Sequence, residues 1–146
     1  MNRAVAPLRL TALDVTDLEA ISTALQDAVA QLGDFDFSSR QRSFTIAFNR
    51  FRWEAGGRKQ RVRCGLQFGH VRAARSHNLR QGAEEAVVNL LSINFAPTQA
   101  PSGEVVLVFS GGGEMRLDVE CLDAAMVDIS APWPATRRPE HELDPS

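Results

Sequence analysis

Residues 114–121 read EMRLDVEC and decide the fold class, because apolar and charged side chains alternate along the whole stretch. The apolar set is Met115, Leu117, Val119 and Cys121. A period of two residues is typical of a β-strand with one face in the core and one in water. Antiparallel sheets commonly keep one solvated face, so this stretch predicts an antiparallel sheet.

A second alternating stretch covers residues 44–53, but its phase shifts by one residue. Apolar side chains alternate up to Phe48 and then continue one residue late, at Phe51 and Trp53. A one-residue slip exchanges the two faces of a strand, and a β-bulge adds one residue to a strand. We therefore predict a bulge at residues 49–50, beyond which Phe51 and Trp53 point into the core.

Alternation also marks residues 61–68, whose apolar side chains face one way while Arg61 and Arg63 face the other. A second slip in phase follows at residues 69–70. Glycine inside a strand often marks such a bend, so we expect the chain to change direction here.

One helix is predicted near the N-terminus. Thr16 and Glu19 are spaced as a capping box, and Asp14 is an alternative cap. Apolar residues then recur at helical spacing from residue 18 to residue 32, and Gly33 suits the end of a helix. We expect this apolar stripe to pack against the sheet.

The chain of 146 residues fits one domain. We predict an α+β fold for residues 1–130, with the N-terminal helix packed on a curled antiparallel β-sheet of about six or seven strands, a roll or partial barrel. Residues 84–92 and 122–129 fit either a strand or a helical turn. Residues 131–146 contain four prolines and show no period, which predicts a largely disordered tail.

The two cysteines, Cys64 and Cys121, both occupy apolar positions of alternating stretches. We interpret them as reduced, buried small side chains, and the alternative is a disulfide between two strands. No stretch approaches the ~20 apolar residues that span a bilayer, and the first residues lack a signal-peptide pattern. We expect a cytoplasmic protein with no membrane contact.

Charge is distributed unevenly along the chain. Residues 40–80 hold eleven basic residues and one acid, a formal charge of +10, whereas the remainder carries −12 and the whole chain −2. The candidate residues for binding an anion or a partner lie in this segment: Arg50, Arg52, Arg61, Arg63, Arg72, Arg75 and Arg80.

Three hypotheses of function follow from this segment. The first is a non-enzymatic interaction module that holds a protein partner on the basic surface or at a sheet edge. The second is a binder of nucleic acid or a phosphate ligand, with Arg52, Arg61 and Arg63 on one face and Trp53 or Phe51 stacking bases. A structural alternative is that Arg61 and Arg63 only neutralise an acidic strand opposite, at Glu114, Asp118 and Glu120.

The third hypothesis is an enzyme with a site around His77, in a loop beside Arg72, Arg75 and Arg80. The sequence supplies little else for catalysis. No histidine has a metal-ligand spacing to another histidine or cysteine, and residues 111–113 lack the Lys and Ser/Thr of a phosphate loop. We therefore predict no catalytic, metal-binding or cofactor-binding residues, and no cofactor.

Five segments together resemble a known family: residues 10–14, 25–28, 49–54, 109–113 and 117–121. The combination is similar to small proteobacterial proteins grouped as a domain of unknown function, family 2948. The resemblance extends to about Trp133 and implies a bacterial cytosolic origin, in keeping with fifteen Arg against one Lys. It implies no activity and carries over no functional residue.

Overall fold

The computed structural model describes residues 7–80 and 82–135, and within them the chain forms one α-helix and eleven β-strands. The helix is α1 (Val15–Ala24), and Leu18 and Ile21 are its buried residues. The strands are β1 (Arg9–Ala12), β2 (Val29–Gln31), β3 (Phe35–Ser38), β4 (Ser43–Phe51), β5 (Gln60–Phe68), β6 (Val71–His77), β7 (Val87–Pro97), β8 (Gly103–Phe109), β9 (Glu114–Val119), β10 (Ala124–Asp128) and β11 (Trp133–Pro134). Three short 3₁₀ turns are η1 (Leu32–Asp34), η2 (Trp53–Ala55) and η3 (Ser110–Gly112).

The described strands form one antiparallel sheet in the order β1-β10-β5-β4-β2-β7-β8-β9-β6, with β3 also paired to β4 and β11 to β5. A single domain with a helix and an antiparallel sheet was predicted and is found. The protein is nevertheless mostly β, and about six or seven strands were too few. The end strands β1 and β6 do not pair with each other, so the sheet is open and the predicted roll or partial barrel is not formed.

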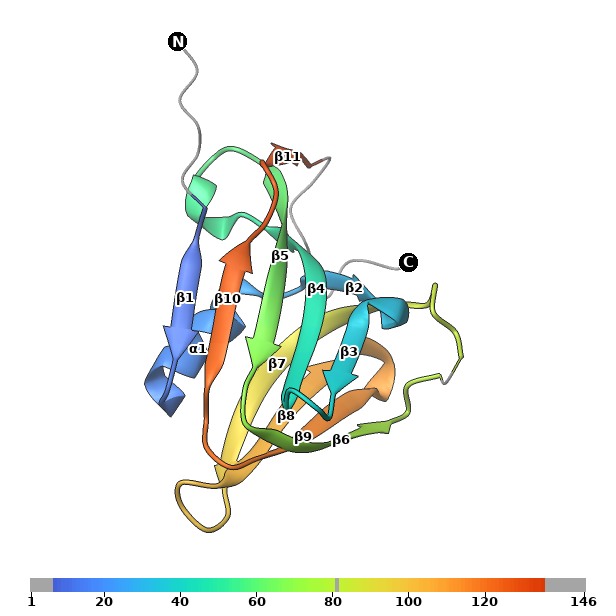
Figure 1. Ribbon diagram of the computed structural model, residues 1–146. Helices are drawn as coiled ribbons and strands as arrows, with labels where there is room; N and C mark the ends of the chain where they lie inside the picture. The colour runs from blue at the N-terminus through green and yellow to red at the C-terminus, as the bar shows by residue number, and fades with distance from the viewer. Residues whose placement is uncertain (1–6, 81, 136–146) are drawn as a thin grey trace.

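The core lies between two parts of this sheet. In Figure 1, β1, β10, β5 and β4 lie in front of β7, β8 and β9. Phe35 joins the two parts, since its ring lies 6.1 Å from that of Phe44 on β4 and 5.4 Å from that of Phe109 on β8. Phe44 and Phe109 are buried, and each contributes about 1.5–3 kcal/mol through removal of apolar surface from water.

The helix begins after Asp14, the alternative cap, and ends earlier than predicted. The Asp14 side chain accepts a hydrogen bond from the Asp17 N–H at 2.8 Å, so Asp14 is the N-cap. The prediction that the helix runs to Gly33 was wrong. Asp27 has a positive φ of 61° and its N–H donates to the Leu90 carbonyl, which turns the chain out of the helix and into β2.

The predicted bulge at residues 49–50 was also wrong. β4 pairs with β5 without interruption from Phe44 to Phe51, so its faces keep one phase and Arg50 follows Phe48 onto the core side. The second predicted slip is confirmed, because β5 ends at Phe68, His70 has a φ of 55°, and the β6–β9 register shifts just after Val71.

Both ambiguous segments turn out to be largely strand. β7 takes up residues 87–92 of the first, and β10 takes up residues 124–128 of the second. In the segment predicted as a tail, β11 pairs with β5, and residues 136–146 lie outside the described residues. Cys64 and Cys121 are both free thiols. No described helix has the length and apolarity needed to cross a bilayer.

Candidate binding site

The arginines of residues 40–80 do not form one basic surface, and Arg50 is the clearest case. Its side chain is fully buried. Nε and Nη2 donate to the two carboxylate oxygens of Asp128 at 2.9 and 2.8 Å. Nη1 and Nη2 donate to the two oxygens of Glu54 at 3.0 and 2.6 Å. Two carboxylates therefore occupy the whole guanidinium, and none of it faces solvent.

This pairing shifts the pKa values of both partners toward the charged form. Burial alone would lower the pKa of Arg50, but hydrogen bonds from its guanidinium to Glu54 and Asp128 outweigh burial and raise it. The hydrogen bond from Arg50 lowers the pKa of Glu54. The three side chains form a cluster of ion pairs within the sheet. Every N–H group of the Arg50 guanidinium donates inside the protein, so none is left for a ligand.

Arg52, Arg61 and Arg63 were predicted to share one face, but only two of them do. Arg52 is buried, donates to the Gln60 side chain, and has its Nε 3.6 Å from a Glu54 oxygen. Arg61 lies over the Phe51 ring at 5.9 Å, and burial lowers its pKa. Arg63 bonds Asn49 at 3.1 Å and pairs with Asp34 at 3.3 Å.

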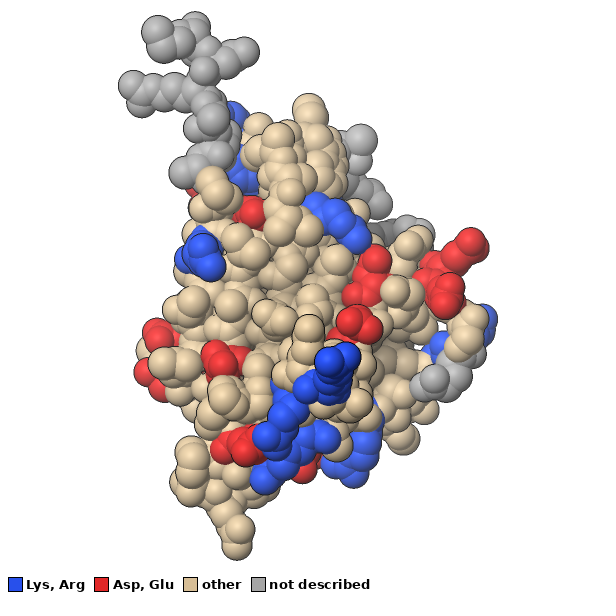
Figure 2. Space-filling view, in the orientation of Figure 1, with Lys and Arg blue, Asp and Glu red and all other residues tan. Residues whose placement is uncertain are grey.

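Acidic side chains neutralise the arginines of β6, though in other pairs than those predicted. Arg72 pairs with Asp118 at 3.0 Å, and Arg75 pairs with Glu104 at 2.8 Å. The remaining predicted acids also have partners within this region: Arg42 pairs with Glu120, and Arg116 pairs with Glu114. Figure 2 shows one cluster of basic side chains low on the face in view, with acidic side chains at its margins, and scattered basic side chains elsewhere.

Like Arg61, Arg80 has no ion-pair partner among residues 7–80 and 82–135, but Arg80 alone of these two lines a pocket with mostly apolar walls. The pocket has a volume of about 210 Å³. Its walls are mostly apolar and come from segments far apart in the chain: Leu32 of η1, Phe35 of β3, Leu79 and Ala83 of the loop after β6, and Met115 of β9.

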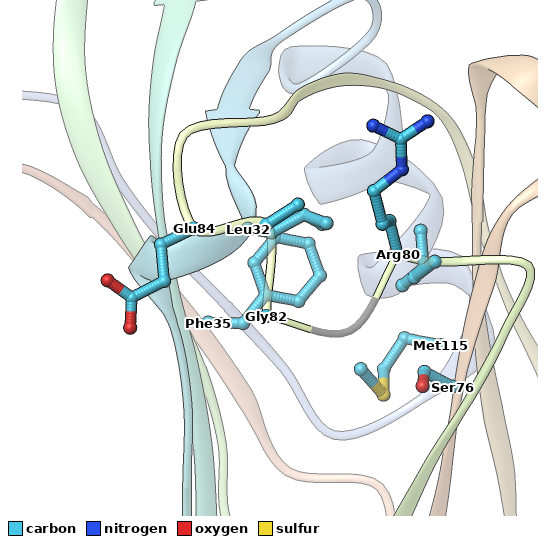
Figure 3. A pocket seen from close by; sticks show the side chains of 9 residues that line it. Leu32, Phe35, Ser76, Arg80, Gly82, Glu84 and Met115 are labelled. Atoms are coloured by element: carbon cyan, nitrogen blue, oxygen red, sulfur yellow. The ribbon is translucent and has the colours of Figure 1, made fainter.

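Figure 3 shows how these side chains lie around the pocket. Leu32 and Phe35 are at its centre, and Met115 and Ser76 are on one side of them. Arg80 and Glu84 stand on opposite sides, and the Glu84 carboxylate points away from the pocket. The pocket is thus apolar within and carries one cation at its rim.

The pocket lies where the sheet remains open, between β3 and β6. Among the described strands, β3 pairs only with β4 and β6 only with β9, so each has a free edge. One backbone bond ties the two sides, from the Val71 N–H to the Arg42 carbonyl at 2.8 Å. Two more hold the loop over the other end, from Leu32 N–H to Ala86 and from Gly33 N–H to Glu84, both at 2.9 Å. We call this opening the seam.

Sequence reasoning singled out Arg80 but missed the apolar walls of its pocket. His77, the predicted centre of an enzyme, is exposed at the end of β6 and lines a neighbouring depression with Arg75, Ser76, Glu114 and Arg116. Within the described part of the chain, no group of three or more His, Cys, Asp or Glu is arranged to hold a metal ion.

Comparison with known proteins gives a family match. A family model described as "Protein of unknown function (DUF2948)" matches residues 8–141. No curated protein and no solved structure matches the chain. The match covers every described element and agrees with the resemblance found in the sequence, but it brings no activity with it.

Proposed function

The chain belongs to the DUF2948 family, and we propose that it is a non-enzymatic interaction module that holds a protein partner at the seam. The observation that carries this proposal is the position of the apolar pocket between two strands with free edges. A free edge offers backbone N–H and C=O groups to an added strand, and pockets beside it give such binding its specificity.

The size of the pocket favours a partner side chain over a free ligand. Pockets for small molecules usually measure about 300–1,000 Å³, whereas this pocket measures about 210 Å³. Its walls at Leu32, Phe35 and Met115 suit an apolar anchor residue. Because the pocket is open to the surface, a protein that approaches along β3 can insert one side chain without rearranging the core.

The distribution of charge favours a protein over a nucleic acid. Arg50, Arg63, Arg72 and Arg75 each have a carboxylate partner in the chain itself. A polyanion would have to displace these partners, whereas a binder of phosphates usually gains its affinity from arginines that face only counterions. Nucleic-acid binding stays the second hypothesis, with Arg61 and the exposed Arg40, Arg58, Lys59 and Arg80 as its remaining cations.

Parallel selection of a random ten-residue peptide library tests this proposal. The baits are the wild-type protein, Ala83→Phe, which fills the pocket, and Ala96→Phe, a control on the exposed part of β7. Circular dichroism confirms that each variant is folded. We expect the selected peptides to bind wild type and Ala96→Phe with equal affinity. Their affinity for Ala83→Phe should be lower by about tenfold or more, a loss equivalent to about 1.4 kcal/mol. Peptides that bind Ala83→Phe as tightly as wild type, or a selection that yields no binding peptide, would overturn the proposal.

A further inference from the structure

We propose that the segment held at the seam is extended and acidic, with an apolar anchor side chain in the pocket and a carboxylate two residues away on Arg80. This inference rests on the proposed function and names the chemistry of the partner.

The charge of Arg80 is the first argument. The other candidate arginines are bonded to acceptors in the chain or packed on a ring, whereas Arg80 has no carboxylate within the described residues. Arg80 stands at the rim of the mostly apolar pocket, and its guanidinium extends away from Ser76 and Met115 (Figure 3). An arginine fork binds a carboxylate through two parallel hydrogen bonds, so an acidic side chain is its natural complement.

The spacing follows from the geometry of a strand. A segment that adds to the free edge of β3 is extended, and its residues i and i+2 lie on the same face, about 6.6–6.8 Å apart. When residue i occupies the pocket, the next side chain on that face reaches the rim. An acid at the adjacent position would instead point to the opposite face, away from Arg80.

The residue on the opposite rim, Glu84, decides on which side of the anchor the acid of the bound segment should lie. Glu84 lies across the pocket from Arg80 and is exposed, and its backbone carbonyl is held by Gly33 N–H. An acid on the Glu84 side of the anchor would find no cation among the residues that line the pocket there. The acid that contributes to binding should therefore lie on the Arg80 side of the anchor.

Fluorescence anisotropy with designed peptides tests this inference. Each labelled peptide has eight residues, with one central Leu in a Thr/Ser background. One further position, two residues before or two residues after the Leu, is Glu, Lys or Thr. The proteins are the wild type, Arg80→Glu, and Arg58→Glu as a control, since Arg58 is also exposed and has no ion pair among the described residues. Titrations at low and near-physiological salt measure the affinities.

We expect a Glu peptide to bind wild type about tenfold more tightly than its Lys counterpart. Arg80→Glu should reverse this preference, and Arg58→Glu should leave it unchanged. One outcome would overturn this inference and leave the proposed function intact. In it, the peptides bind wild type and not Ala83→Phe, but Glu peptides bind no more tightly than Lys or Thr peptides. Absence of pocket-dependent binding with every peptide, together with a failed library selection, would overturn both. A preference that Arg58→Glu reverses equally would assign the effect to general electrostatics and also overturn the inference.

Discussion

Arg50 and Asp128 are 78 residues apart in sequence and meet inside the sheet, where two parallel hydrogen bonds of 2.9 and 2.8 Å join the guanidinium to the carboxylate. Asp128 also accepts the Leu8 N–H at 3.0 Å. The pair thus connects β4, β10 and the chain that enters β1. Because the side chains of Arg50 and Asp128 are 0% and 4% exposed, neither charge has water as an alternative partner.

Removal of one partner of this pair should destabilise the protein strongly. We expect Arg50→Met to cost about 3–5 kcal/mol of unfolding free energy, because it leaves the Asp128 charge buried and without its partner. Urea denaturation followed by circular dichroism measures the loss. The control is Arg75→Met, which breaks the exposed pair with Glu104 and should cost at most about 1 kcal/mol. Equal losses in both variants would contradict the assignment.

The Arg50–Glu54 contact makes stability depend on pH on the acid side. Arg50 lowers the pKa of Glu54 in the folded protein below its ordinary value of 4.5. The unfolded chain therefore takes up a proton first, and the stability from this contact is present above pH 4.5 and is lost as pH falls through the folded pKa. As the pH is lowered below 4.5, we expect the urea concentration at the midpoint of unfolding to decrease. The decrease should be smaller in Glu54→Gln. An identical acid profile in the two proteins would argue against this contact.

Cys64 should remain protonated and unreactive in the folded protein. Burial raises the pKa of its thiol to about 12 from an ordinary 9.0. Iodoacetamide at pH 8 should therefore label Cys64 only after the protein is unfolded in urea, as mass spectrometry of its peptides would show. Between pH 9.0 and about 12 the unfolded thiol ionises and the folded thiol does not, so stability should fall as pH rises. The decline should be shallower in Cys64→Ala.

Two strand glycines should respond in opposite ways to the same substitution. A Cβ at Gly103 would lie 2.5 Å from the Phe95 ring and 2.7 Å from the Ala96 carbonyl oxygen, whereas a Cβ at Gly65 meets no atom within 4 Å. We expect Gly103→Ala to cost about 1–3 kcal/mol through overpacking. Gly65→Ala should add about 0.5–1 kcal/mol, because alanine loses less conformational freedom on folding. Thermal denaturation compares the two variants, and destabilisation of both to the same extent would argue against the close approach at Gly103.

Nucleic-acid binding, the second hypothesis, predicts a measurable alternative. Anisotropy with labelled single-stranded RNA and DNA should show no micromolar binding at about 0.15 M salt, because most of the arginines are already paired. Tight binding that survives this salt and disappears in an Arg61→Ala/Arg63→Ala double variant would favour the nucleic-acid hypothesis instead.

The alternation of side chains was enough to predict an antiparallel sheet, but the interior of β4 could not be read from it. A charged residue in an apolar position looks like a break in phase, so Arg50 suggested a bulge that does not exist. Its burial depends on Asp128, from a strand that reaches β4 only through β5. Nothing local to residue 50 indicates this partner.

The candidate site was hidden for a related reason. Leu32 and Met115 look like ordinary core positions within their own segments, and only the spatial meeting of η1 and β9 turns them into pocket walls. Arg80 was one of seven candidates on charge alone. The acids that pair with Arg50, Arg63, Arg72 and Arg75 include residues of η1, β8, β9 and β10, and these contacts are long-range in sequence.

The pairing of β1 with β10 also bears on how the protein folds during synthesis. Arg9 lies opposite Val127, so the first strand has no strand partner until nearly all of the described chain has been made. A ribosome adds roughly 5–20 residues per second, which leaves the β1 edge waiting for several seconds with its backbone groups unpaired. Completion of the front of the sheet is therefore a late event, and a truncated chain that lacks residues 124–128 should persist as a substrate for chaperones and proteases.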